Sequence, residues 1–314
     1  MPLSERYRRQ VALLVEVMPF VAAETEFALK GGTAINLFIR DMPRLSVDID
    51  LTYLPVAPRP KSLAAIDAAM KRMARAIRAG HRGARVTEVL NAREQIVTKL
   101  TVQVPDAQIK IEVTPVLRGC VFEPQVRSVR PGVEDAFGFA QIQVVSFADL
   151  YAGKIMAALD RQHPRDLFDV RDLLANEGVS DDLRRAFIVY LISHDRPISE
   201  VLIPRRKDIA QEFAQGFDGM TAELVGLDEL LAAREALIAA VAYGMPEAHK
   251  AFLLGFKRGA PDWTLLGVPG AADLPAVRWK QLNLDKLSAD TRNRLVDQLA
   301  EVLRRTGAAN AATT

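Results

Sequence analysis

The chain has 314 residues, of which 49% are hydrophobic and 25% charged, values typical of a globular protein of roughly two domains. Its 41 Lys and Arg residues nearly balance its 39 Asp and Glu residues, so the net charge of +2 excludes any overall electrostatic argument for nucleic-acid binding. The single cysteine, Cys120, excludes an internal disulfide framework and a multi-cysteine metal cluster, and it suits a reducing cytoplasm. No apolar run approaches the roughly 20 residues of a membrane span.

The first predicted elements surround a glycine-rich turn. In chain order they are a helix over 4–25, a strand over 26–30, a helix over 34–40 and a strand over 46–53. The first helix is expected to bend or break near Pro19. Between the second and third elements, Gly31 and Gly32 form a turn whose N–H groups can hold phosphate, and Thr33 is expected to cap the next helix.

Two aspartates lie in the strand over 46–53. Residues two apart in a strand share a face, so Asp48 and Asp50 project together while Ile49 points to the apolar side. Adjacent carboxylates repel each other unless a cation neutralises them. Paired carboxylates beside a phosphate-holding turn indicate a magnesium-dependent site for phosphoryl or nucleotidyl transfer.

A basic helix is predicted over 62–79, after a proline-rich linker. Lys71, Arg75, Arg78 and Arg82 are spaced so that they share a face for as long as the helix continues. This stripe suits a nucleic-acid backbone, and a solvated helix face is an equally good interpretation.

The chain then becomes β-rich, with strands predicted over 85–90, 96–104, 109–116, 121–129 and 142–145. In the third of these, Ile111 and Val113 alternate with Glu112, which places Glu112 on the polar face. Beside the strand of Asp48 and Asp50, Glu112 would supply a third metal ligand, although any amphipathic strand can carry this pattern.

From Ser146 onward the periodicity is helical. Lys154 lies in the first of these helices, and Asp166 and Asp169 lie three apart in the next, which begins at Pro164. One interpretation is a salt bridge between the two helices. We therefore expect an α+β fold, with an α/β domain and a mixed sheet over 1–145 and a mostly helical domain over 146–314 that completes a cleft.

Several segments carry a family resemblance. Gly-Gly-Thr followed by Asp-x-Asp resembles the signature of the DNA polymerase β-like nucleotidyltransferases. The fuller segment KGGTAINLF…PRLSVDIDL is similar to the AbiEii/AbiGii-type toxins of bacterial toxin–antitoxin systems, which include the MenT toxins. KIMAALDR (154–161) with PRDLFDV (164–170) resembles the same family, and so do two segments of the C-terminal half, FKRGAPDW and LPAVRWKQLNL.

The resemblance implies roles for named residues. Asp48, Asp50 and Glu112 would bind two Mg²⁺ ions, and Gly31, Gly32 and Thr33 would hold NTP phosphates. Arg44 would be a phosphate ligand and Ser46 a hydroxyl near the metal; a solvated loop residue and a strand-start residue are the alternatives. Lys154 would contact nucleotide phosphate, and Asp166 would position that lysine or act as a base.

The resemblance also implies a biological role. The acceptor would be an RNA such as a tRNA 3′ end, its extension would block translation in the cytoplasm, and a cognate antitoxin would be a partner. A nucleotidyltransferase that modifies a protein or a small molecule such as an aminoglycoside is the alternative acceptor class. A catalytically silent nucleotide- or partner-binding module is the alternative of another class.

Overall fold

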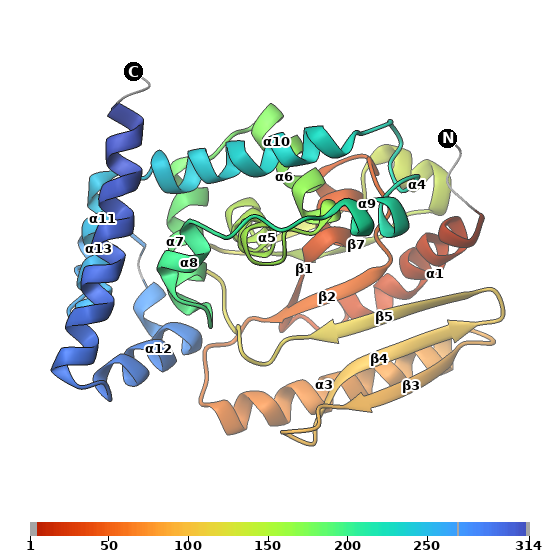
Figure 1. Cartoon of the computed structure of the whole chain (residues 1–314). Coiled ribbons are helices and arrows are strands. Elements are labelled where there is room, and N and C mark those ends of the chain that lie inside the picture. The colour runs from red at the N-terminus through yellow and green to blue at the C-terminus, as the bar shows by residue number, and fades with distance from the viewer. Residues whose placement is uncertain (1–4, 269, 312–314) are drawn as a thin grey trace. The chain divides into compact units, whose positions relative to one another are not determined.

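The computed structural model describes residues 5–268 and 270–311, with the side chains of 307–311 excepted, and its contacts divide into two compact units (Figure 1). Unit 1 contains the residues up to Ser146 together with Asp218–Leu224. Unit 2 contains Phe147–Phe217 and the residues from Val225 onward. The division into domains at 145/146 stays a prediction.

Unit 1 is built on a seven-stranded mixed sheet in the order β3-β4-β5-β2-β1-β7-β6. Its strands are β1 (Phe27–Lys30), β2 (Asp48–Tyr53), β3 (Arg85–Leu90), β4 (Val97–Val104), β5 (Ala107–Val113), β6 (Gln125–Ser128) and β7 (Gln141–Val144). The pairs β2–β5 and β1–β7 are parallel, and the other neighbours are antiparallel. The expected mixed sheet is thus confirmed.

Unit 1 also contains helical segments, several of which pack against this sheet. They are α1 (Glu5–Ala22), α2 (Gly31–Thr33), the π-helical segment η1 (Ala34–Ile39), α3 (Arg59–Gly80) and α4 (Pro131–Phe137). In Figure 1, α3 runs along β3 and β4, against which it packs, while α1 packs against β5 and β7. Because side chains alternate along a strand, Ile49, Leu100 and Ile111 are fully buried on one face. Their polar neighbours therefore gather on the other face.

The first helix differs from its prediction. Pro19 neither ends nor breaks α1, which continues to Ala22. A proline removes one helical hydrogen bond and is most disruptive in a helix interior. Pro19 lies in the last turn of α1, where few hydrogen bonds follow it.

Unit 2 is helical, as expected for the C-terminal half. Its elements are α5 (Phe147–Arg161), α6 (Pro164–Asn176), α7 (Asp181–Ser193), α8 (Ile198–Leu202), α9 (Ala210–Gly216), α10 (Leu227–Ile238), η2 (Ala239–Tyr243), α11 (Glu247–Arg258), η3 (Trp263–Leu265), η4 (Ala271–Asp273), α12 (Pro275–Asp285) and α13 (Ala289–Ala311). The helix α5 packs against α6 and α7, and α10 packs against α6. Phe168 and Phe187 are fully buried in this core.

Within the part of the chain that the structure describes, no helix is both long enough and apolar enough to cross a membrane.

The buried face of the sheet predicts a stability contrast. Replacing Ile111, which is fully buried, by alanine should lower the free energy of unfolding by about 2–5 kcal/mol, because it removes apolar contacts and leaves a cavity. Replacing Val126, which is 66% exposed on β6, should change it by about 0.5 kcal/mol or less. Urea denaturation followed by circular dichroism measures both, and equal losses would contradict this assignment of the core.

Candidate functional site

The glycine turn after β1 fits closely against its neighbours. Gly31 has φ +74°, and a Cβ atom there would lie 2.6 Å from Oδ2 of Asp50. A Cβ atom on Gly32 would lie 2.8 Å from Oγ of Ser46 and 2.9 Å from a guanidinium nitrogen of Arg44. Both positions therefore need glycine, because the backbone itself lies against the residues predicted to bind phosphate and metal.

Thr33 does not cap a helix, so that prediction is wrong. The helical turn already begins at Gly31, and Thr33 has helical φ and ψ of −66° and −42°. Its hydroxyl lies within hydrogen-bond distance of the backbone oxygen of Asp48, at 2.5 Å, and of Oγ of Ser46, at 3.1 Å. Thr33 therefore joins the glycine turn to the start of β2. The π-helical segment that follows is a feature often found at functional sites.

Arg44 and Ser46 belong to a segment held by a distant part of the chain. Arg44 pairs with Thr221 in an antiparallel bridge, and the Leu45 N–H donates to Met220 O at 3.2 Å. The guanidinium of Arg44 is buried and donates to Leu45 O at 2.8 Å. Arg44 is therefore an ordered residue and not the solvated loop residue of the alternative interpretation.

The three carboxylates predicted to bind metal lie on one face of neighbouring strands. In the parallel pairing of β2 with β5, Asp48 lies opposite Lys110 and Asp50 lies opposite Glu112. Registered residues of paired strands share a face. The prediction that β5 neighbours β2 and presents Glu112 beside Asp50 is confirmed as a placement, while its metal-binding role stays a prediction.

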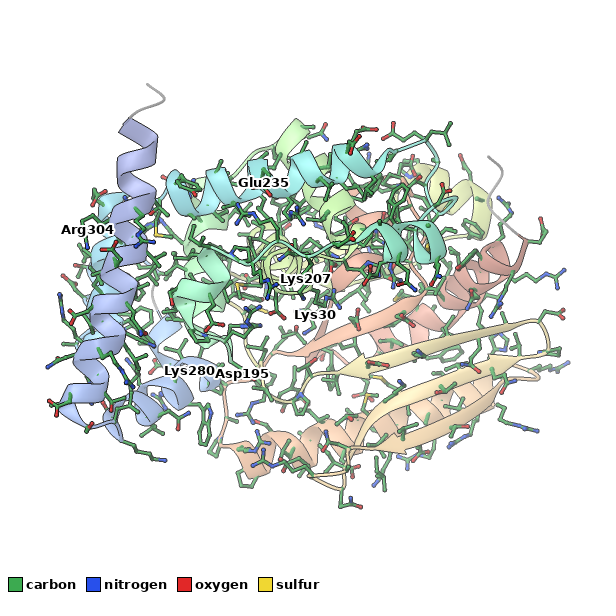
Figure 2. The ribbon with its side chains drawn as sticks, viewed as in Figure 1. Lys30, Asp195, Lys207, Glu235, Lys280 and Arg304 are labelled. Carbon is green, nitrogen blue, oxygen red and sulfur yellow. The ribbon has the colours of Figure 1, made fainter. Side chains whose placement is uncertain are left out.

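Lysines border the carboxylates on the same face. Lys30, at the end of β1 and labelled in Figure 2, lies opposite Asp50. On the other side, Lys99 of β4 lies opposite Glu112, and its Nζ is 2.7 Å from Oε1 of that carboxylate. This ion pair, half-exposed, was not anticipated from the sequence, although the period-two alternation of the two strands carries the signal.

The donor set suits magnesium, which prefers carboxylate oxygens. Asp50 lies against a glycine that admits no side chain, and Asp48 and Glu112 lie on the same face. The site is not closed around a cation, however: among the residues that the structure describes, no three His, Cys, Asp or Glu side chains are arranged to hold a metal. The ion pair of Glu112 with Lys99 is one physical reason.

The basic helix is less open to phosphate than its sequence indicates. The helix α3 ends at Gly80, so Arg82 lies beyond it and does not extend the predicted stripe. Lys71 is paired with Asp67, and Arg78 is paired with Glu88. Two further basic residues of α3 also have acidic partners, Arg59 with Glu94 and Arg72 with Glu24. Much of the charge of this helix is therefore neutralised within unit 1.

Lys154 and Asp166 form a buried ionic cluster in unit 2. Nζ of Lys154 lies 2.9 Å from Asp166 and 2.8 Å from Asp169, and all three side chains are buried. Arg161 donates to the same Asp166 oxygen at 3.0 Å and lies 2.8 Å from the second oxygen, an ion pair that the sequence did not indicate. Burial alone would raise the pKa of Asp166, but the attraction of Lys154 and Arg161 outweighs it and holds this pKa below its ordinary value.

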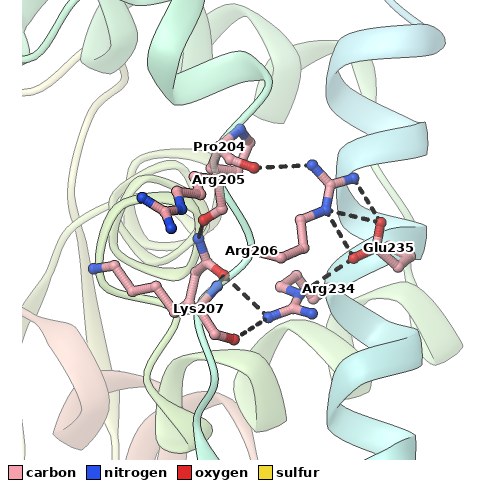
Figure 3. Close-up of polar contacts among 7 residues, drawn as sticks. Pro204, Arg205, Arg206, Lys207, Arg234 and Glu235 are labelled. Atoms are coloured by element: carbon pink, nitrogen blue, oxygen red, sulfur yellow. Dashed lines mark hydrogen bonds and ion pairs between the residues drawn. The ribbon is translucent and has the colours of Figure 1, made fainter.

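The end of α5 beside this cluster is held by a network around Gln162, which has φ +55°. The Gln162 side chain donates to Arg205 O at 2.8 Å and accepts from the Lys207 N–H at 3.0 Å. Figure 3 shows Arg234 donating to Lys207 O and Arg206 paired with Glu235. The segment 204–207 is thus fixed to the turn that separates Lys154 from Asp166.

The predicted site residues fall into two groups. Unit 1 brings together Gly31, Gly32, Thr33, Arg44, Ser46, Asp48, Asp50 and Glu112. Unit 2 brings together Lys154 and Asp166. The common cleft between the two groups stays a prediction.

Comparisons with known proteins agree with this fold. A family model described as "Nucleotidyl transferase AbiEii toxin, Type IV TA system" matches residues 12–281. Among solved structures, the chain is similar to MenT4, a nucleotidyltransferase toxin of Mycobacterium tuberculosis H37Rv, with a TM-score of 0.56 and 15% sequence identity. That similarity covers 96% of this chain and 93% of MenT4, and at this identity it shows a shared fold. No curated protein matches the chain.

The close fit at Gly31 predicts a loss in Gly31→Ala. This variant should lower the free energy of unfolding by about 2–3 kcal/mol, from the strain of a positive φ and from displacement of the Asp50 carboxylate. Gly83→Ala is a matched control, because Gly83 has φ +83° and no atom within 4 Å of the added Cβ. Urea denaturation of both variants measures the difference. Equal losses of unfolding free energy would show that the contact with Asp50 does not contribute to the destabilisation.

The cluster in unit 2 predicts a pH-dependent stability. The folded-state pKa of Asp166 is lowered, so its contribution to stability is present above the unfolded-state pKa and is lost as pH falls through the folded-state pKa. Asp166→Asn should cost about 3–5 kcal/mol at pH 7, and this difference from the wild type should shrink below about pH 4. Urea denaturation between pH 3 and pH 7 measures it. Asp182→Asn, at an exposed position of α7, is the control, and a pH-independent cost of Asp166→Asn would contradict the ionic origin.

Proposed function

Since this chain belongs to the AbiEii family of nucleotidyltransferase toxins of type IV toxin–antitoxin systems, we propose that it transfers nucleotides from an NTP to the 3′ end of an RNA such as tRNA. Extension of that end would prevent the RNA from serving in translation and would arrest growth. NTPs and tRNA are cytoplasmic, so the proposed site of action is the cytoplasm. The cognate antitoxin would bind or modify the toxin.

The observation that carries the proposal is the contact of the glycine turn with the carboxylate strand. Gly31 and Asp50 lie so close that a Cβ atom on Gly31 would be 2.6 Å from Oδ2 of Asp50, which places the backbone of the turn beside an acidic oxygen. Such a turn can hold the β- and γ-phosphates while the carboxylates hold the cations that accompany them.

Each site residue then has a proposed task. The backbone of Gly31, Gly32 and Thr33 holds phosphate oxygens, and the buried guanidinium of Arg44 adds positive charge behind Gly32. The hydroxyl of Thr33 keeps Ser46 and β2 in place.

Asp48, Asp50 and Glu112 would hold two Mg²⁺ ions, which lower the pKa of the acceptor hydroxyl and neutralise the leaving oxygens. The acceptor hydroxyl attacks the α-phosphorus in line, a new phosphodiester bond forms, and pyrophosphate leaves.

Lys154 would contact nucleotide phosphate. In the structure its ammonium lies between Asp166 and Asp169, which keep it charged and oriented. Asp166 is therefore better suited to positioning Lys154 than to accepting a proton, because its lowered pKa makes it a weak base. Arg161 shares the charge of Asp166 and would allow Lys154 to turn toward a phosphate.

A second acceptor class also has structural support. The ion pairs along α3 occupy basic residues that an RNA backbone would otherwise contact. Transfer to a protein or a small molecule such as an aminoglycoside needs no such stripe. A silent nucleotide- or partner-binding module is the remaining alternative, and it requires that the carboxylates have no effect on NTP turnover.

One experiment separates these functions. The protein is incubated with each α-³²P-labelled NTP, Mg²⁺ and total RNA, and the label should appear in RNA of tRNA size. Asp48→Asn and Asp50→Asn should lower transfer at least 100-fold and remove growth inhibition, and circular dichroism verifies that each variant is folded. Asp106→Asn is the control, since Asp106 is an exposed carboxylate in the β4–β5 turn.

The outcomes distinguish the candidates. Label in protein or in an added aminoglycoside, and none in RNA, would replace the RNA acceptor. NTP turnover unchanged in Asp48→Asn would favour the silent module, and a toxic Asp50→Asn variant would refute the metal assignment.

A further inference from the structure

Four charged side chains form a row across four neighbouring strands. Lys30 of β1 lies opposite Asp50 of β2, Asp50 opposite Glu112 of β5, and Glu112 opposite Lys99 of β4. The row therefore reads positive, negative, negative, positive along the hydrogen-bonding direction of the sheet. The pair on β5 and β4 is in direct contact, with Lys99 Nζ 2.7 Å from Glu112 Oε1.

The order of charges has an electrostatic consequence. Neighbouring strands are about 4.8 Å apart, so Asp50 and Glu112 are like charges directly opposite each other, an arrangement that destabilises a sheet. Lys30 and Lys99 flank this pair. Burial lowers the pKa of Lys30 against the attraction of Asp50, so Lys99, which contacts Glu112 directly, is the firmer compensating charge. A cation that takes Glu112 as a ligand has to compete with Lys99 for that carboxylate.

We propose that Lys99 is a positioning residue that makes cation binding depend on nucleotide binding, an inference that rests on the proposed nucleotidyl transfer. In the free protein, Lys99 holds Glu112 and weakens the site for a free divalent cation. An NTP brings a triphosphate that offers Lys99 another anionic partner. Once Lys99 leaves Glu112, that carboxylate is available to the cation that accompanies the nucleotide.

The exchange makes two binding events mutually favourable. Because coupling between binding events is reciprocal, nucleotide should raise the affinity for the cation by the factor by which the cation raises the affinity for nucleotide. The side chains of Lys99 and Glu112 are 34% and 41% exposed, so solvent screens their attraction. Partly exposed ion pairs shift equilibria by up to roughly fivefold, which sets the expected size of the effect.

The test uses Mn²⁺ as the probe of the cation site. Electron paramagnetic resonance of free Mn²⁺ gives its affinity for the full-length protein without nucleotide. Calorimetry with the α,β-methylene analogue of each of the four NTPs, in the absence of divalent cation, gives the affinity for nucleotide. Lys99→Met keeps the side-chain length and removes the charge, and Lys99→Arg keeps the charge.

Lys71→Met is the matched control. Lys71 is also a lysine of unit 1 with a carboxylate at 2.7 Å, that of Asp67, and its side chain is 44% exposed. It lies on α3, away from the carboxylate face of the sheet. Its loss changes the net charge of the protein by the same amount as Lys99→Met, so the pair separates a local effect from a general one.

The expected result is a pair of opposite shifts. Lys99→Met should bind Mn²⁺ about three- to fivefold more tightly than the wild type does, and it should bind the α,β-methylene NTP analogue about three- to fivefold more weakly. Lys99→Arg and Lys71→Met should resemble the wild type in both affinities. A merely structural role for Lys99 would weaken both affinities. Circular dichroism and the melting temperature verify that each variant is folded.

Three results would overturn the inference. They are unchanged or weaker Mn²⁺ binding in Lys99→Met, equal tightening in Lys71→Met, and analogue binding that does not respond to Lys99. These leave the proposed function intact if transfer still requires Asp48 and Asp50. If no variant binds Mn²⁺ with or without the analogue and no transfer occurs, the proposed function fails together with the inference.

Discussion

The parallel pairing of β2 with β5 is the constraint on which the candidate site depends. It fixes Asp50 opposite Glu112 and leaves Ile49 and Ile111 on the buried face. A shift of one residue in this register would exchange the two faces, placing carboxylates in the apolar core and isoleucines beside the glycine turn. The apolar contacts with α1 and α3 therefore hold the acidic side chains in register. The same strand register therefore sets both the apolar core of unit 1 and the position of its carboxylates.

Unit 2 contains a buried ionic cluster. A buried lysine and two buried aspartates are costly to desolvate, and they persist because each charge has a partner at hydrogen-bond distance. Arg161 brings a fourth charge and balances the cluster. The network around Gln162 and Arg234 holds the turn between α5 and α6, so the distance between Lys154 and Asp166 does not depend on a mobile loop. This rigidity would preorganise Lys154 for the phosphate contact proposed above.

Much of the fold could be predicted from local patterns, and the exceptions have identifiable causes. Alternation located the strand with Asp48 and Asp50, and Pro164 marked the start of α6. Thr33 was expected to cap a helix because threonine commonly does so, but its hydroxyl instead contacts Ser46 and the backbone of Asp48. Such a contact depends on how two strands come together, which no local pattern contains. For the same reason the sequence did not indicate that Lys99 binds Glu112.

Asp218–Leu224 belong to unit 1 although they lie between two segments of unit 2 in the sequence, and this has a consequence for synthesis on the ribosome. These residues pair with Pro43, Arg44 and Leu45, immediately before the carboxylate strand. Translation proceeds from the N-terminus, so the sheet of unit 1 can be complete while the residues that brace its glycine turn have not yet been made. The segment that carries Arg44 and Ser46 gains this support only after Phe147–Phe217 of unit 2 have been made. The protein would thus acquire its braced site late in its own synthesis.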